Sequence, residues 1–265
     1  MSQYDEETTV TPLGDGHFRG QVSGQWNIGD NPNGGYLLSL ITNAIGQSIE
    51  HPDPISVTTH YLRPGLPEHD CDIAVEVLRT GRTLSTVRAT LTQDGKARLT
   101  VLTAYSDLST PAGLDSDITL PAPELPAPDD CVQRSAEAQG VHLPILERLD
   151  TRLDPACAVP GAADRALIRG MIRFADGRAP DARALLLFTD SFPPSPLSKL
   201  GSVGWVPTLE LTVHVRRRPA PGWIVAELST DDLNDGRMVE TGALWDSQGQ
   251  LVAQSRQIGL VMKQT

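Results

Sequence analysis

Residues 33–49 read NGGYLLSLITNAIGQSI, and this stretch decides the fold. Asn33-Gly34-Gly35 is a turn signal, after which the sequence changes to helical spacing. The apolar side chains then recur every three or four residues, at Leu37, Leu40, Ile41, Ala44, Ile45 and Ile49. The pattern predicts one long helix over Tyr36–Ile49, whose apolar stripe must be buried against another element.

Strand-like segments lie on both sides of this helix. Upstream, residues 8–13 and 17–26 flank Gly14-Asp15-Gly16, which is a hairpin signal. Downstream, four segments near residues 55–62, 71–80, 83–92 and 96–106 follow, in which apolar and polar side chains alternate most clearly in the last two. Alternation of this kind is typical of an antiparallel sheet with one face in water. We expect the helix to pack on the dry face of that sheet.

The same landmarks occur twice along the chain. Gly81-Arg82 recurs as Gly236-Arg237 (236 − 81 = 155), and Arg63-Pro64 recurs as Arg218-Pro219 (218 − 63 = 155). Asp94-Gly95 recurs as Gln248-Gly249, one residue out of step (248 − 94 = 154). A period this long is that of a duplicated domain and not of a solenoid repeat.

The second copy is predicted to contain strands near residues 165–175, 207–216, 222–230, 237–246 and 250–262. Its helix is predicted from about Ser191 to Leu200, interrupted by prolines 193, 194 and 196. The apolar run Ala184–Phe188 fits either a buried strand or the start of a helix. We therefore predict an α+β fold of two tandem domains, residues 1–109 and 141–265, joined by a Pro- and Asp-rich linker over residues 110–140.

Composition excludes several classes of function. The net charge is −11 and no basic run is long enough to track a phosphate backbone, so no nucleic-acid partner is expected. No apolar run approaches the roughly 20 residues of a membrane span, and the N-terminus lacks the pattern of a signal peptide. The 3 cysteines suit neither a disulfide framework nor a zinc site, which favours a reducing cytoplasm.

Two copies of a helix wrapped by an antiparallel sheet resemble the double hot-dog arrangement, and the motifs resemble the acyl-CoA thioesterase II family. In the first copy these are Gly34-Gly35, Tyr61-Leu62-Arg63-Pro64-Gly65 and the segment Leu78–Ser85. In the second copy they are Thr189-Asp190-Ser191, Pro207-Thr208-Leu209-Glu210, and Val252-Ala253 followed by Gln257. The resemblance covers nearly the whole chain outside the linker and residues 164–178.

The resemblance implies an acyl-CoA substrate, hydrolysis by an activated water, and no metal or cofactor. The water-holding roles fall on Asp190, Thr208 and Gln257. The backbone N–H of Gly35 is expected at the thioester carbonyl, with Gly34 or Tyr36 beside it. Arg63, Arg79 or Arg82 is expected to offset the charge of coenzyme A. Open sheet edges also allow a homo-oligomer.

The residues alone leave other interpretations open. The repeat offset pairs Asp190 with Gly35, so the two copies differ at equivalent positions, as one composite site requires. Asp190 also fits an ordinary helix N-cap, and the two glycines fit a plain turn. Thr208 fits a common strand residue and Gln257 an exposed one, while Glu210 is an alternative base.

Two other functions remain as alternatives. The groove of such a fold could bind an acyl thioester or lipid without turning it over. Hot-dog folds also support enoyl-CoA hydratase-like enzymes, which commonly use an Asp–His pair, and no such pair stands out here. A Gly-x-Ser-x-Gly elbow is absent, which argues against an α/β-hydrolase.

Overall fold

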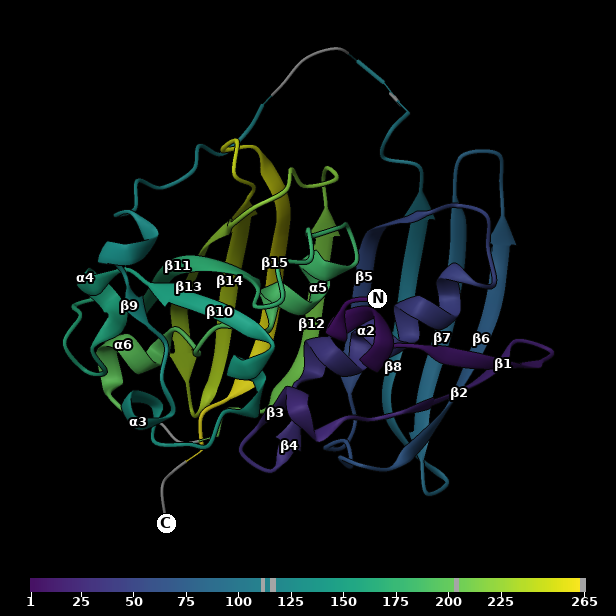
Figure 1. Ribbon diagram of the computed structural model, residues 1–265, viewed down its shortest axis with the longest axis horizontal. Coiled ribbons are helices and arrows are strands. Elements are labelled where there is room, and N and C mark those ends of the chain that lie inside the picture. Colours follow the sequence, from purple (N-terminus) through teal and green to yellow (C-terminus); the bar gives the residue numbers. More distant parts are fainter. Residues whose placement is uncertain (111–112, 115–117, 203–204, 263–265) are drawn as a thin grey trace.

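The computed structural model describes residues 1–110, 113–114, 118–202 and 205–262 (Figure 1). The predicted linker includes residues 111–112 and 115–117, which lie outside this description. One 13-stranded sheet runs through the molecule in the order β1-β2-β6-β7-β8-β5-β12-β15-β14-β13-β11-β10-β9, and every neighbouring pair is antiparallel. This arrangement confirms the predicted α+β double hot-dog class.

The two halves of the sheet repeat the same strand order on either side of a seam between β5 and β12. The first half contains β1 (Val10–Gly14), β2 (His17–Gln21), β5 (Asp53–Tyr61), β6 (Asp70–Thr80), β7 (Ser85–Gln93) and β8 (Lys96–Ser106). Their counterparts are β10 (Leu149–Leu153), β11 (Leu167–Phe174), β12 (Thr208–Val215), β13 (Ile224–Asn234), β14 (Arg237–Trp245) and β15 (Leu251–Leu260). At the seam, Thr58 and Thr212 share a hydrogen bond between hydroxyls 3.0 Å apart, 154 positions from each other.

The first-half helix is α2 (Gly34–Gly46). The side chain of Asn33 accepts a hydrogen bond from the Tyr36 N–H and so caps the first turn. Ten of its residues from Gly35 to Ile45 are buried, including the whole predicted apolar stripe up to Ile45. The helix ends at Gly46 and not at Ile49, because glycine has low helix propensity and Gln47 forms the C-cap.

The second-half helix differs from its prediction. Residues 191–200 do not form one helix: α5 (Ala184–Thr189) ends before them, and only Pro196–Leu200 is helical, as α6. The prolines between them remove backbone donors and disfavour helical conformation in the preceding residue. The apolar run at 184–188 is therefore the helix that packs on α2, and its interpretation as a strand was wrong.

Elements absent from the sequence prediction complete the second half. These are the two-residue strand β9 (Val132–Gln133), strand β10 and the short helix α3 (Ala136–Gln139), so residues 128–140 already contribute structure beside β10. In the first half, the unpredicted pair β3 (Asn27–Ile28) and β4 (Asn31–Pro32) leads into α2. The β3–β4 pair and α3 border the pocket described below.

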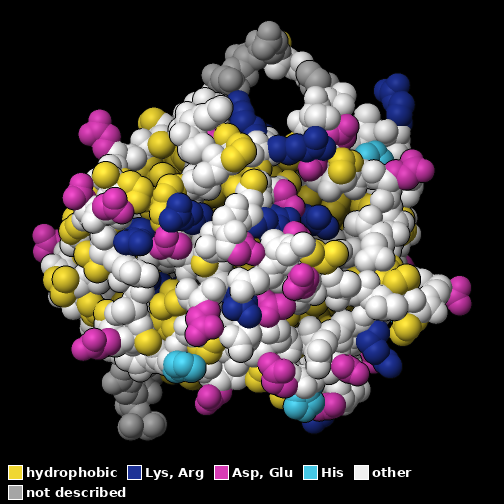
Figure 2. Space-filling model, viewed as in Figure 1, with side chains coloured by type: hydrophobic (Ala, Val, Ile, Leu, Met, Phe, Trp, Pro, Cys, Tyr) yellow, Lys and Arg dark blue, Asp and Glu magenta, His cyan; other side chains and the backbone are white. Residues whose placement is uncertain are grey.

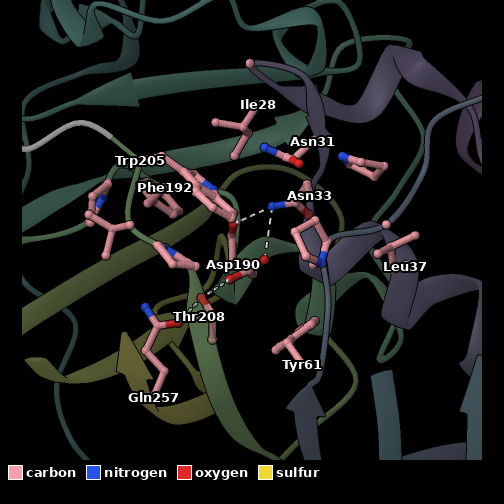
Figure 3. Close-up of a pocket in the computed structure, with 18 of the residues that line it drawn as sticks. Ile28, Asn31, Asn33, Leu37, Tyr61, Asp190, Phe192, Trp205, Thr208 and Gln257 are labelled. Atoms are coloured by element: carbon pink, nitrogen blue, oxygen red, sulfur yellow. Dashed lines mark hydrogen bonds between the residues drawn. The ribbon is translucent and has the colours of Figure 1, made fainter. Parts of the chain in front are cut away.

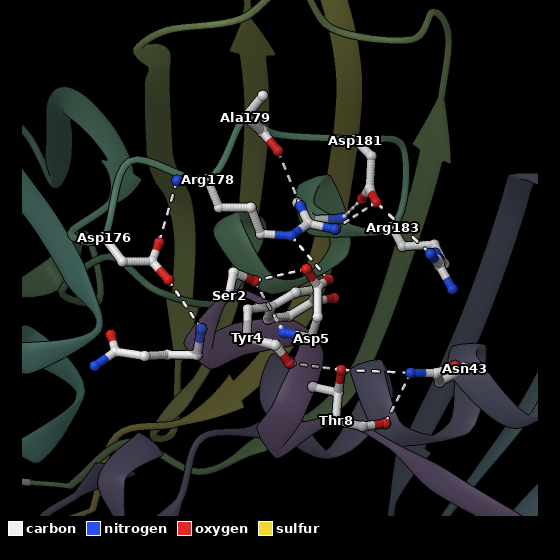
Figure 4. Close-up of polar contacts among 12 residues, drawn as sticks. Ser2, Tyr4, Asp5, Thr8, Asn43, Asp176, Arg178, Ala179, Asp181 and Arg183 are labelled. Atoms are coloured by element: carbon white, nitrogen blue, oxygen red, sulfur yellow. Dashed lines mark hydrogen bonds and ion pairs between the residues drawn. The ribbon is translucent and has the colours of Figure 1, made fainter.

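The N-terminal helix α1 (Gln3–Glu7) lies over the α2–α5 pair and joins the two halves (Figures 1 and 4). Arg178 of the second half pairs with Asp5, 2.9 Å away, and its guanidinium lies over the Tyr4 ring. Glu7 accepts two hydrogen bonds from Arg148 and one from the Trp26 indole. The first residues of the chain therefore connect the two halves through these contacts. Their sequence gave no indication of that role. On the face seen in Figure 2, basic side chains are interspersed with acidic ones.

Candidate active site

A pocket of about 530 Å³ lies where residues of the two halves meet (Figure 3). The first half contributes residues 28–34, Leu37 and the motif 61–65. The second half contributes residues that include Asp190, Thr208 and Gln257, together with apolar side chains such as Phe192, Leu228 and Met238. The structure therefore brings the three residues of the expected water site into one cavity, together with Gly34.

Asp190 follows α5 as its C-cap, so the helix N-cap interpretation was wrong. Its carboxylate instead reaches the N-terminus of α2 in the other half. Atom Oδ2 accepts hydrogen bonds from the Gly35 N–H at 2.8 Å and from the Asn33 side-chain amide at 3.1 Å. The same amide donates to the Asp190 carbonyl at 2.7 Å. A helix N-terminus favours a negative charge, so the start of α2 favours the ionised form of the acid from the other half.

Close packing of α2 on α5 makes this contact possible. A Cβ at Gly35 would stand 2.9 Å from the Leu187 Cα and 3.0 Å from its carbonyl oxygen. Because backbone atoms cannot move aside as a side-chain tip can, only glycine fits at this crossing. The requirement at Gly35 is therefore steric, whatever its part in the chemistry.

The pKa of Asp190 is raised to about 6, chiefly by burial and in part by the negative charge of Glu240. Hydrogen bonds from Gly35, Thr208 and Asn33 act in the opposite direction. A carboxyl with a pKa near 6 is mostly ionised at neutral pH and binds a proton more readily than an exposed aspartate does. That is the range in which a carboxylate serves as a general base.

Thr208 and Gln257 come from neighbouring strands, β12 and β15. The Thr208 hydroxyl oxygen lies 3.2 Å from Gln257 Oε1 and 3.5 Å from Asp190 Oδ1. A hydroxyl has one hydrogen, so it donates to one of these oxygens at a time. The shorter distance favours the bond to Gln257, which leaves Asp190 Oδ1 weakly engaged on the pocket side.

Glu240, on β14 opposite Gln257, is a site residue that the sequence analysis missed. It is 2% exposed, and its carboxylate accepts hydrogen bonds from the Gln257 amide and the Ser195 N–H. Burial raises its pKa. A signal was available in the sequence: Glu240 is in phase with the buried Met238 and Leu244 of an alternating strand. An acid at an inward position of a strand is rare unless its charge has hydrogen-bond donors.

The helix start offers a donor other than the expected one. The Gly35 N–H is engaged by Asp190, whereas the Gly34 N–H has no acceptor among the described residues. A Cβ at Gly34 would stand 2.8 Å from the Tyr61 ring and 2.9 Å from Asp190 Oδ2. Gly34 thus leaves a narrow space between a phenol and a carboxylate. The Tyr61 hydroxyl is buried and has no hydrogen-bond partner in the described part of the chain.

Of the other residues expected to bind substrate or act as a base, some line the pocket and others lie elsewhere. Arg63 lines the pocket, and its guanidinium donates to the Ala97 carbonyl. Tyr36 points away, because its hydroxyl donates to the Glu7 carbonyl. Arg82 lies in the turn between β6 and β7 and does not line the pocket. The alternative base Glu210 is not among the lining residues either, and it accepts a hydrogen bond from Thr212.

The equivalent place in the first half lacks these groups. The strand registers pair Thr103 with Val57 and Val87, as they pair Gln257 with Leu211 and Glu240. Thr103 and Val87 therefore occupy the positions of Gln257 and Glu240. By the same registers Pro54 stands for Thr208. The repeat offset that paired Asp190 with Gly35 does not hold at the helices, because Gly35 lies in the first turn of α2 and Asp190 is the C-cap of α5. Among the described residues, this arrangement of two carboxylates, a hydroxyl and an amide is therefore found in the second half.

No helix among the described residues is long and apolar enough to cross a membrane. No group of three or more His, Cys, Asp or Glu side chains within the same ranges could hold a metal ion.

Comparison with known proteins places both halves in one family. Residues 22–109 match the family model of the acyl-CoA thioesterase N-terminal domain, and residues 128–261 match that of the C-terminal domain. A structure from Thermobifida fusca assigned as a thioesterase II is 30% identical, covers 99% of this chain and 98% of its own, and superposes with a TM-score of 0.88.

Two more distant structures share the fold. A hot-dog protein of unknown function from Alicyclobacillus acidocaldarius is 20% identical over the full length of both chains, with a TM-score of 0.88. The acyl-CoA thioesterase II of Mycobacterium marinum is 19% identical over 99% of each chain, with a TM-score of 0.76. The matched models span most of both halves, so the chain belongs to the acyl-CoA thioesterase family and is a thioester hydrolase.

Proposed function

We propose that this enzyme hydrolyses acyl-coenzyme A to the free acid and coenzyme A, using a water held by Asp190, Thr208 and Gln257. The observation that carries the proposal is the convergence of these three side chains beside the start of α2. Asp190 has a pKa of about 6, so it is available as a base at neutral pH. Pure binding of a thioester would have no use for a buried carboxylate of this kind.

In the proposed reaction, the water lies between Asp190 Oδ1 and the Thr208 hydroxyl oxygen. Asp190 takes a proton from the water while the water oxygen attacks the thioester carbonyl carbon. The carbonyl oxygen gains negative charge, which the free Gly34 N–H and the dipole of α2 stabilise. The carbon–sulfur bond then breaks, and the coenzyme A thiolate takes the proton from Asp190. In this scheme Gly35 orients Asp190, and Gly34 polarises the substrate.

The rest of the pocket divides into an apolar and a polar part. Phe192, Leu228 and Met238 are apolar lining residues with little exposed surface, and they suit an acyl chain. Arg63 is exposed and lines the pocket, so it suits the anionic coenzyme A. No histidine is found among the described residues that line the pocket, which disfavours the hydratase alternative with its Asp–His pair.

The free and buried state of Cys71, Cys131 and Cys157 suits a reducing compartment, and we place the enzyme in the cytoplasm on that basis. Its substrates would then be the acyl-CoA thioesters of lipid metabolism.

The test is thiol release from acyl-CoAs of increasing chain length by the wild type and Asp190→Asn. We expect turnover that Asp190→Asn lowers at least 100-fold, because proton transfer to a positioned base contributes about 10²–10⁴-fold. Asp232→Asn, at an exposed position, is the control. Binding of a non-hydrolysable thioether analogue should survive in both variants. Binding without thiol release at any chain length would reject hydrolysis and favour the acyl-binding alternative.

A further inference from the structure

Glu240 is a second buried carboxylate in the pocket, and the proposed chemistry does not use it. Its two oxygens accept hydrogen bonds from different elements: the Gln257 side chain on β15 and the Ser195 N–H before α6, the latter at 2.7 Å. Ser195 is itself held by a hydroxyl contact of 2.8 Å with Thr230. The Ser195 donor is thus held by a second contact of its own side chain.

The direction of these hydrogen bonds has a chemical consequence. An ionised carboxylate only accepts hydrogen bonds, so Gln257 must present its NH₂ group to Glu240. The amide oxygen of Gln257 then faces Thr208, 3.2 Å away, and only the Thr208 hydroxyl can supply the hydrogen. The oxygen lone pairs of Thr208 remain for another donor. The donor that the proposed hydrolysis brings there is the water.

We propose that Glu240 is a positioning residue that fixes the hydrogen-bond direction through Gln257 and Thr208, so that Thr208 accepts from the attacking water and Asp190 Oδ1 stays free to take its proton. This inference rests on the proposed hydrolysis. It adds a fourth residue to the three that the resemblance implied, and the equivalent position in the first half is Val87.

Glu240 also acts on Asp190 through its charge. Among the described residues neither carboxylate forms an ion pair. The buried Arg134 lines the same pocket, but it donates to the Ser191 carbonyl and to Gln139. The groups that face Asp190 are Gly35, Asn33, Thr208 and the Tyr61 ring, none of them cationic. The negative charge of Glu240 is therefore uncompensated and makes Asp190 a stronger base.

The first test compares Glu240→Gln with Glu227→Gln. Glu227 lies on β13 of the same half, bonds Arg169 and does not line the pocket. The side chain in Glu240→Gln can present either its oxygen or its NH₂ group to Gln257, so the direction of that hydrogen bond is no longer fixed. We expect kcat to fall about 10- to 100-fold in Glu240→Gln, as misplaced catalytic groups typically cause, with KM changed less than about twofold. Glu227→Gln should match the wild type.

The second test is a double-mutant cycle with Gln257→Met. Because the hydrogen-bond direction is set through Gln257, adding Glu240→Gln to Gln257→Met should lower kcat by less than Glu240→Gln does in the wild type. The remaining loss is the effect of the Glu240 charge on Asp190. Losses that multiply in full would overturn the route through Gln257. Thermal unfolding of each variant, before the kinetics, separates these effects from a loss of folding.

The third test does not depend on turnover. Carbon-13 NMR of aspartate-labelled protein follows the Asp190 carboxyl, assigned as the resonance missing from Asp190→Asn. We expect the titration midpoint to move to lower pH in Glu240→Gln, because a like charge is removed. An unchanged midpoint together with wild-type kcat would overturn the proposal for Glu240. A shifted midpoint in a protein that hydrolyses no acyl-CoA would support the contact and reject the hydrolysis.

Discussion

The carboxylate of Asp190 accepts a hydrogen bond from the backbone N–H of Gly35, 155 positions earlier in the chain. The C-terminal end of α5 in the second half thus meets the first turn of α2 in the first half. Because each residue needs the other, the effect of changing either should appear at the same site.

Gly35→Ala should disrupt both packing and catalysis. The new methyl group would collide with the backbone of Leu187 at about 3 Å and push α2 away from α5. We expect a loss of about 1–3 kcal/mol in unfolding free energy, as overpacking usually costs, and a large loss of kcat. Gly46→Ala is the matched control at the other end of α2, where the nearest atom is the Arg183 side chain at 3.8 Å. Equal activity of both variants, measured with urea titration alongside, would contradict the close-packing account.

The pH dependence of kcat should have an acid limb near pH 6. Asp190 must be ionised to accept the proton, and burial raises its pKa to about 6. Below that pH the rate should fall about tenfold per pH unit, and above it the rate should be level. Initial rates from pH 4.5 to 8 with saturating substrate test this. A midpoint near 4 would mean that Asp190 is not the titrating group.

Asp190→Asn should stabilise the folded protein at alkaline pH. The folded pKa of Asp190 lies above its usual value of 3.8, so the folded state binds the proton more tightly than the unfolded state does. The stability contributed by that proton is present below pH 4 and is lost as the pH rises through about 6. Asparagine keeps an acceptor for Gly35 without the charge, so we expect a gain of up to about 3 kcal/mol at pH 8. Urea unfolding at pH 5 and pH 8 should show a smaller gain at pH 5.

Thr208→Val should remove the hydroxyl while keeping the side-chain shape. The water would then lose one of its two acceptors, and we expect kcat to fall by about 10²-fold with KM nearly constant. Thr90→Val removes a hydroxyl bonded to Thr100 in the first half, outside the pocket, and should leave kcat unchanged. If stopped-flow kinetics show equal losses in the two variants, the hydroxyl of Thr208 has no special role.

Arg63 and Arg82 were both expected to bind coenzyme A, and the structure separates them. Arg63 lines the pocket and Arg82 does not. Arg63→Ala should raise KM several-fold, with the increase weakening at high salt because the contact is electrostatic. Arg82→Ala should leave KM unchanged. The measurement is KM for one acyl-CoA between 50 and 500 mM salt, and a larger effect at Arg82 would reassign the coenzyme site.

Local sequence patterns predicted the first helix and most of the longer strands, but not β3, β4, β9 or β10. Alternation placed β7 and β8 within about two residues, and the turn landmarks fall between equivalent strands of the two halves. These signals are local, because each depends on which face of one element is buried. The second helix was misplaced because its proline-rich continuation looked like a broken copy of α2, while the six-residue α5 was too short to show a helical period.

The site was predictable only where a residue had a counterpart in a motif. Asp190, Thr208 and Gln257 came from the resemblance, and their convergence depends on strand register, which no single segment reveals. The contact between Gly35 and Asp190 depends on how two helices cross. Glu240 had a local signal in its inward phase, but its partners Gln257 and Ser195 are 17 and 45 positions away.

The contact between Gly35 and Asp190 also means that neither half of the chain holds this site by itself. The acid belongs to the second half, and two of the donors that hold it, the Gly35 N–H and the Asn33 amide, belong to the first. One polypeptide supplies both sets, so the described arrangement uses two hot-dog units for one acid.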